Sequence, residues 1–150
     1  MVINHIRVAR ATERAALEAL QWRASLVGDQ YRDDLLANPD AIELPDDQIE
    51  QGYVHVCERN GAVVGFMVVL PREDRHAELD GLFVDPDVWR SGIGRTLVDE
   101  ARAFAARSGA PMLRVVANPD AISFYEACGF SACGTEATRF GLAVTMSIST

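Results

Sequence analysis

The chain has 150 residues, of which 49% are hydrophobic and 24% are charged, proportions that predict one globular, soluble domain over residues 1–150. Its formal net charge of −8 argues against nucleic acid or an anionic membrane as a partner, because both are bound by basic surfaces. Its three cysteines and three histidines lack the spacing of metal ligands, which predicts no metal and a reducing, cytoplasmic setting.

The N-terminal part predicts one strand and two helices. Apolar and polar residues alternate over 2–9, and apolar residues then recur every three or four positions after Thr12, which with Ala11 is the candidate helix cap. The stretch 39–52 is acidic and turn-rich, and it is equally well an ordinary connection or a wall facing a substrate. The expected elements are a strand over 2–9, helices over 12–26 and 30–37 separated by Gly28-Asp29, and a helical turn over 46–51.

Residues 53–70 predict a β-hairpin. Apolar runs over 53–58 and 62–70 flank Asn60-Gly61, a dipeptide that tight hairpin turns favour. The second run is the longest apolar stretch of the chain and is far too short to cross a bilayer, so no membrane association is expected.

The middle of the chain predicts a strand, a glycine-containing loop and an amphipathic helix. The strand over 79–84 stops at Asp85-Pro86, and from Ile93 the apolar positions recur at spacings of three and four. At this helix start, free N–H groups and the helix dipole suit a phosphate. By itself, however, the loop is equally consistent with a tight connection in which the glycines only permit the turn. The loop reads Arg90-Ser91-Gly92-Ile93-Gly94-Arg95.

Two well-known nucleotide-binding motifs do not fit this loop. A dinucleotide fingerprint requires a third glycine where Leu97 stands. A P-loop requires a lysine followed by serine or threonine after its second glycine, and neither is present. The function of the loop therefore depends on support from another part of the chain.

The C-terminal part supplies a second motif and completes the sheet. Residues 112–117 predict a strand, and Asn118-Pro119 then opens a helix that Gly129 ends. Extended structure follows from Phe130, with a last strand over 142–149. The predicted fold is a mixed α/β domain, with a mostly antiparallel central sheet flanked by helices in the order β-α-α-β-β-β-α-β-α-β-β.

Together, the two motifs resemble those of the Gcn5-related N-acetyltransferase (GNAT) family. Residues 118–130 read NxxAxxFYxxxGF and follow the strand–RxGxG–helix unit by one strand, with roughly the separation that the family has. The resemblance covers both signature regions and, through the order of the elements, effectively the whole chain. It implies a GNAT-like fold and an acyltransferase that moves an acetyl group from acetyl-CoA directly to a primary amine in a ternary complex. The alternative is a non-enzymatic acyl-CoA-binding or sensor module on the same fold.

The resemblance also implies the cofactor side of the site. The loop amides would hold the pyrophosphate of acetyl-CoA, and the main chain of the preceding strand would bind the pantetheine arm. Asn118 would contact the cofactor where two strands splay apart, and Tyr125 would protonate the departing CoA thiolate. Trp89 stands where the family often has Gln or Arg. The implied cofactor-binding residues are Leu82, Phe83, Val84, Arg90, Ser91, Gly92, Ile93, Gly94, Arg95, Asn118 and Tyr125.

The acceptor side is left more open. A protonated amine must lose a proton before it attacks the thioester. Glu78 aligns with the glutamate that serves as base in histone-acetylating members of the family, Asp80 is the alternative on the same face of the strand, and His76 is a third choice. The acceptor is a small amine, amino acid, antibiotic or protein amine, the acyl group is acetyl or longer, and a homodimer, common in the family, is left open. Candidate acceptor contacts are Asp33, Asp34, Asp46, Asp47, Glu50, Arg32 and Arg139.

Overall fold

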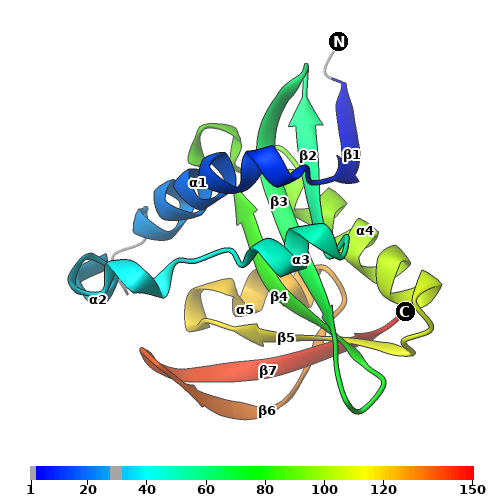
Figure 1. Cartoon of the computed structure of the whole chain (residues 1–150). Helices are drawn as coiled ribbons and strands as arrows, with labels where there is room; N and C mark the ends of the chain where they lie inside the picture. The colour runs from blue at the N-terminus through cyan, green and yellow to red at the C-terminus, as the bar shows by residue number, and fades with distance from the viewer. Residues whose placement is uncertain (1–2, 28–31) are drawn as a thin grey trace. The chain divides into compact units, whose positions relative to one another are not determined.

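The computed structural model describes residues 3–27 and 32–150 (Figure 1). Seven strands form one sheet in the order β1-β2-β3-β4-β5-β7-β6. Among the described pairings, β4–β5 is parallel, and β1–β2, β2–β3, β5–β7 and β6–β7 are antiparallel. The predicted fold class, a mixed and mostly antiparallel sheet with flanking helices, is confirmed.

The strands are β1 (Asn4–Val8), β2 (Val54–Arg59), β3 (Ala62–Pro71), β4 (Ala77–Val84), β5 (Met112–Ala117), β6 (Ser131–Thr138) and β7 (Gly141–Ser149). The α-helices are α1 (Arg14–Leu26), α2 (Arg32–Ala37), α3 (Asp46–Glu50), α4 (Ile93–Arg107) and α5 (Ile122–Ala127). Short 3-10 turns are η1 (Ala11–Glu13), η2 (Pro39–Ala41), η3 (Pro86–Val88) and η4 (Pro119–Ala121).

Most predicted elements are present, with small shifts at their ends. The strand over 112–117 and the start of α4 at Ile93 lie where the sequence places them. The turn predicted over 46–51 is a helix, α3, which the predicted element order omits. Val2 and the segment 28–31, which includes the predicted helix break, lie outside the described residues.

The start of the first helix differs from the prediction at its cap. The chain enters through the 3-10 turn η1, for which Arg10 is the N-cap residue. The Arg10 backbone N–H donates to the Glu13 carboxylate over 2.8 Å. The candidate caps Thr12 and Ala11 lie inside that turn, because the acidic side chain three residues on satisfies the free amide better than a hydroxyl within the turn.

The chain forms two compact units, and β3, β4 and α4 contribute to both. The first unit comprises residues 1–68 and 81–97. Its core includes Phe66, which is fully buried and lies with its ring centroid 5.2 Å from that of Phe83. Gly65 has no side chain where the Phe83 carbonyl and the α4 side chain of Leu97 approach; a Cβ there would lie 3.0 and 3.1 Å from them. A glycine is therefore required for this close packing.

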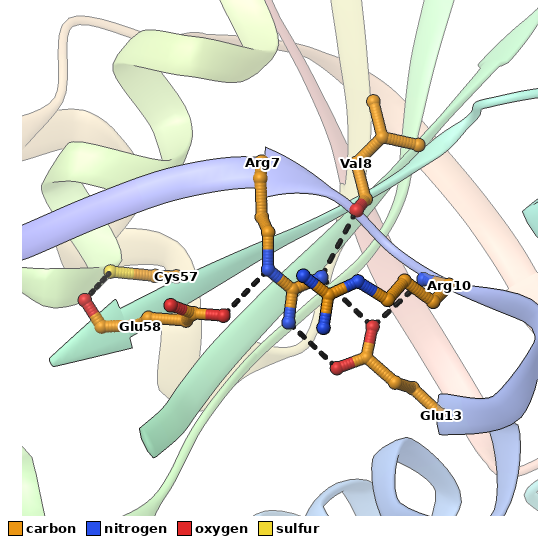
Figure 2. Close-up of polar contacts among 6 residues, drawn as sticks. All are labelled: Arg7, Val8, Arg10, Glu13, Cys57 and Glu58. Atoms are coloured by element: carbon orange, nitrogen blue, oxygen red, sulfur yellow. Dashed lines mark hydrogen bonds and ion pairs between the residues drawn. The ribbon is translucent and has the colours of Figure 1, made fainter. Parts of the chain in front are cut away.

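A cluster of charged side chains connects β1 and β2 with the turn η1 through hydrogen bonds (Figure 2). The Arg7 guanidinium donates to both carboxylate oxygens of Glu13, over 2.7 and 2.9 Å, and to Glu58 over 2.6 Å. The Arg7 hydrogen bonds and charge hold the pKa of Glu13 down at about 2, although partial burial acts against them. Because both carboxylates are largely shielded from solvent, this cluster stabilises the first unit more than an exposed pair would.

The second unit comprises residues 69–80 and 98–150. In it β5 pairs with β4 on one side and with β7 on the other, and the β6–β7 hairpin (orange to red in Figure 1) extends the sheet. Leu113, Val115 and Ala117 on one face of β5 are buried, whereas Arg114 and Val116 on the other face are half-buried. The alternation shows that one face of β5 is buried in the protein, whereas the other face is partly open to solvent.

Three further sequence predictions concern the whole chain. No helix in the described part of the chain is long and apolar enough to cross a membrane. Residues 3–27 and 32–150 contain no group of three His, Cys, Asp or Glu side chains that could hold a metal ion. The division of residues 1–150 into a single domain stays a prediction.

Candidate functional site

The loop before α4 has the backbone geometry of an anion site. Arg90 and Gly92 both adopt positive φ angles, of 65° and 86°, and α4 runs for 15 residues from Ile93. The backbone N–H groups of Gly92, Ile93 and Gly94 donate to no acceptor in the described part of the chain. Alternating left- and right-handed residues turn successive N–H groups toward a common point, and the helix dipole adds positive potential there.

Local hydrogen bonds hold this loop in place. The Asp85 carboxylate accepts from the Asp87 N–H over 3.1 Å, as the cap of η3. The same carboxylate forms an ion pair of 3.0 Å with Arg23 of α1. The Ser91 hydroxyl donates to the Val88 carbonyl. The loop is thus fixed by its own polar groups and by α1, while its free amides remain available.

Trp89 makes the contact that departs most from the expected pattern. Its indole Nε1–H donates to the backbone carbonyl of Val84 over 2.7 Å, although the side chain is 45% exposed. The sequence-based hypothesis places a pantetheine arm against the main chain of Leu82, Phe83 and Val84, which are half-buried. One carbonyl of that segment already has a donor in this structure, supplied by the residue where the family often has Gln or Arg.

The two carboxylates predicted as candidate bases lie in the second unit and differ in their partners. Glu78 accepts from Arg72 over 2.8 Å, and Arg72 also contacts Asp74 over 3.2 Å. Asp80, by contrast, forms no hydrogen bond or ion pair with the described residues. Its side chain reaches solvent, but desolvation by the protein atoms around it raises the pKa of the Asp80 carboxyl, and the charge of Glu78 raises it further. Asp80 is therefore the more available proton acceptor of the two.

The pairing of β4 with β5 ends just before Asp80. The parallel register of β4 with β5 joins Ala77–Leu79 to Leu113–Val115. The next residues along each strand, Asp80 and Val116, are not paired with each other. The two strands therefore separate next to the Asp80 carboxylate.

Tyr125, the candidate general acid, lies in α5 and is 7% exposed. Its ring packs between those of Phe124 and Phe130, with centroids 5.1 and 5.3 Å away. Burial raises the pKa of the Tyr125 phenol well above its ordinary value, with a smaller effect from Cys128. The hydroxyl has no hydrogen-bond partner among the described residues. Tyr125 thus remains protonated at neutral pH and can donate to a group that is not part of the chain.

Asn118 was expected both to cap a helix and to contact a cofactor. It does occupy the N-cap position of η4, but its side chain forms no cap hydrogen bond. The residue is exposed, and its amide has no partner among the described residues. The side chain is therefore free to bind a ligand, as the second expectation requires.

The structure divides the predicted site residues between the two compact units. Glu78, Asp80, Asn118 and Tyr125 belong to the second unit. The backbone segment 82–84 and the loop 90–95 belong to the first. His76, the third candidate base, lies 3.8 Å from Asp74 through its Nδ1, within the same turn as Arg72, and is better placed to hold that turn.

Sequence reasoning missed three polar residues near these positions. Arg72 engages Glu78, Arg23 engages Asp85, and Arg114 lies beside Glu78 in the sheet register. Arg114 carried no distinct signal, because a polar residue between Leu113 and Val115 is the ordinary alternation of a half-exposed strand. The two ion pairs carried none either, since they depend on how the strands and helices meet.

A comparison with family models supplies the deciding observation. The model described as "Acetyltransferase (GNAT) family" matches residues 15–130. The chain belongs to this family. Its membership confirms the resemblance that the two sequence motifs indicate, and the family is one of acyltransferases.

Relatives and solved structures agree with that assignment. A peptidyl-lysine N-acetyltransferase of Salmonella typhimurium, YjaB, is 33% identical over 139 residues, which cover 89% of this chain and 87% of that protein. An uncharacterised N-acetyltransferase of Methanocaldococcus jannaschii is 38% identical over 90 residues, 54% of this chain, and the match spans only 39% of the archaeal protein. The PaiA N-acetyltransferase of Thermoplasma acidophilum, solved in complex with coenzyme A, has a TM-score of 0.77 with 19% identity, covering 99% of both chains. That likeness shows the fold.

Proposed function

We propose that this GNAT-family chain is an acetyl-CoA-dependent N-acetyltransferase that transfers the acetyl group directly to a primary amine in a ternary complex. The observation that carries the proposal is the set of free N–H groups of Gly92, Ile93 and Gly94 at the start of α4. Three amides without acceptors at the positive end of a long helix suit the pyrophosphate of CoA. Arg90, Ser91 and Arg95 complete the proposed cradle.

The rest of the cofactor would bind along β4 and at the end of β5. The main chain of Leu82, Phe83 and Val84 would hold the pantetheine arm as a strand-like partner. The Trp89 indole must then share or release the Val84 carbonyl. Asn118, with its free amide, would hydrogen-bond the cofactor.

Acetyl-CoA supplies an acetyl group activated as a thioester, and the chain's own residues handle two protons. Asp80 takes a proton from the ammonium group of the acceptor, directly or through water, and the free amine can then form the new C–N bond. The C–S bond breaks, and Tyr125 donates its phenolic proton to the departing thiolate. The nitrogen of the new amide then loses its second proton, which restores the Tyr125 phenol. No cysteine nucleophile is needed.

We assign the base role to Asp80 ahead of Glu78. The Glu78 carboxylate is engaged by the Arg72 guanidinium over 2.8 Å, so one of its oxygens is not free to collect a proton. The pKa of Asp80 is raised by desolvation, and a higher pKa makes a carboxylate a stronger base. Glu78 then keeps Asp80 basic through its charge.

Titration calorimetry followed by an acceptor screen tests the proposal. We expect acetyl-CoA to bind with micromolar or tighter affinity, and free CoA thiol to appear steadily when an acceptor amine is added. The absence of binding heat for both acetyl-CoA and CoA would refute the cofactor assignment. Binding without thiol release from any amine would identify the chain as an acyl-CoA-binding or sensor module instead.

The name of one relative suggests a class of acceptor to include in the screen, and four other predictions are untested. The Salmonella relative is named for peptidyl-lysine, and a lysine amine is among the primary amines to be screened. Acetyl as the acyl group, a cytoplasmic location, a homodimer and the absence of metal stay predictions.

A further inference from the structure

A positively charged side chain without a partner lies on β5 beside the proposed base. The Nε of Arg114 is shielded from solvent and has no hydrogen-bond acceptor, and no ion pair of Arg114 exists among the described residues. A shielded guanidinium donor without an acceptor costs folding free energy. That cost is removed when an anion binds.

The sheet register places Arg114 on the same face as both carboxylates. Arg114 is the direct partner of Glu78 in the parallel β4–β5 pairing, and side chains at paired positions project to the same side. Asp80 is two residues farther along β4 and so projects to that side too. Diagonal neighbours in a regular antiparallel pair lie about 7–8 Å apart, and here β4 and β5 are no longer paired beyond Leu79. A molecule of a few heavy atoms fits between the two groups.

The charges on this face do not cancel. Glu78 is engaged by Arg72 over 2.8 Å, and the same arginine also contacts Asp74. Asp80 and Arg114 remain, one unpaired acid and one unpaired cation. Their complement is a molecule that carries an ammonium group and a carboxylate close together.

We propose that the acceptor is a small amino acid-type molecule, whose carboxylate binds the Arg114 guanidinium and whose amine faces Asp80. The inference rests on the proposed acetyl transfer and narrows its substrate class. Arg114 would be a specificity-determining residue. A guanidinium binds a carboxylate through two parallel N–H donors, which an ammonium group cannot reproduce. Arg32, an earlier candidate for this role, already donates to the Leu26 carbonyl over 2.9 Å.

The test compares acceptors that differ only in the carboxylate. Common L-amino acids, their amides and the corresponding decarboxylated amines are assayed at saturating acetyl-CoA by release of CoA thiol. We expect kcat/KM for at least one amino acid to exceed that of its amide by about 30-fold or more, because a site built around a charged group rejects the analogue that lacks it. In Arg114→Met this preference disappears through a higher KM for the amino acid, with the amide little changed.

Controls separate a specific role from a structural one. Arg107→Met removes an exposed arginine of the same unit that is paired with Glu100, and it should leave the preference intact. Arg114→Lys keeps the charge without the two-pronged geometry, and it should lower kcat/KM for the amino acid by about fivefold or more. The lysine variant decides the question if the methionine variant does not fold.

Each outcome bears on one proposal or the other. If amides, amines or lysine-containing peptides are acetylated as well as amino acids, or if Arg114→Met slows all acceptors equally, the amino acid inference is wrong while acetyl transfer stands. If acetyl-CoA does not bind, acetyl transfer is wrong. Direct titration of amino acids and amides into wild type and Arg114→Met then still decides the carboxylate site: equal binding of both ligands, or none, refutes it.

Discussion

Desolvation affects the acid–base properties of two residues in the second unit. Desolvation raises the pKa of both Tyr125 and Asp80. For the phenol this keeps the proton in place at neutral pH and also makes the phenol a weaker acid than an exposed tyrosine. For the carboxylate it raises proton affinity toward that of the ammonium group it must deprotonate. Desolvation thus strengthens the proposed proton acceptor and keeps the proposed proton donor protonated.

Tyr125→Phe removes the proposed proton donor and keeps the ring. We expect kcat to fall about 10- to 1000-fold, the range of general acid contributions, while the acetyl-CoA dissociation constant changes less than about twofold. Because the hydroxyl has no partner within the described chain, the melting temperature should stay within a few degrees. Steady-state kinetics, calorimetry and thermal melts measure the three quantities. An unchanged kcat would remove Tyr125 from the mechanism.

The Glu13 carboxylate predicts how stability responds to acid. Its folded pKa of about 2 lies below the ordinary value of 4.5, so its ion pair with Arg7 stabilises the fold above pH 4.5. That contribution is lost as pH falls from about 4.5 toward 2, because the unfolded chain then binds a proton that the folded chain does not.

Glu13→Gln should therefore be less stable than wild type at pH 7, by roughly 1–3 kcal/mol. The difference in unfolding free energy should shrink between about pH 4.5 and pH 2, as measured by urea titrations. A difference that stayed constant over this range would show that the substitution acts through packing alone. Glu100→Gln, which touches the exposed pair with Arg107, is the matched control and should change stability by less than about 1 kcal/mol.

The loop between β4 and α4 depends on backbone conformation more than on side chains. Gly92 has a φ of 86°, and a Cβ built there meets nothing within 4 Å. Substitution is therefore limited by conformation and charge, since there is room for the atoms. Asparagine tolerates the left-handed region better than other non-glycine residues.

Gly92→Asn and Gly92→Asp form a matched pair of nearly equal size. We expect the asparagine variant to retain acetyl-CoA binding with a loss of about tenfold or less. The aspartate variant should lose about 100-fold or more, because its charge faces the pyrophosphate. Calorimetry with acetyl-CoA compares the two. Equal affinities in the pair would show that no phosphate binds at this loop.

Periodicity and turn chemistry predicted most elements, because they depend on neighbouring residues. The hairpin at Asn60-Gly61 has both residues at positive φ, and Gly129 ends α5 in the left-handed conformation at 102°, as their residue types require. The Trp89 bond to Val84 and the Arg72 bond to Glu78 were beyond such reasoning. Both depend on side-chain rotamers and on where the strand ends, which one sequence does not specify.

The candidate site was predictable to a similar degree. Residue identities at the loop and at Tyr125 followed from the resemblance to the family. The choice between Glu78 and Asp80 did not, since it turns on an arginine in the preceding turn. The proposed role of Arg114 in binding a carboxylate could be inferred only from the sheet register, which places Arg114 beside Glu78.

At the scale of the whole molecule, the net charge of −8 distinguishes classes of acceptor. A negative field attracts polycations and acts weakly on a zwitterion, which carries no net charge. Raising ionic strength from about 0.01 M to about 1 M shortens the screening length from about 30 Å to about 3 Å.

We expect KM for a polyamine to rise several-fold over this range, and KM for the preferred amino acid to change by less than about threefold. Initial rates at fixed acetyl-CoA measure both. If KM for the amino acid rose as steeply as KM for the polyamine, the net charge of the protein would not distinguish the two classes of acceptor. Sodium and potassium chloride should give the same curves, since the effect depends on ionic strength.

The bond between the Trp89 indole and the Val84 carbonyl has an optical consequence. The chain contains two tryptophans, so Trp22→Phe leaves Trp89 as the single tryptophan fluorophore. Its indole N–H donates to β4, the strand proposed to bind the pantetheine arm. Indole emission responds to loss of a hydrogen bond and to exclusion of water. The emission of that variant should shift as acetyl-CoA binds, and the protein would then report its own cofactor occupancy in real time, without a label.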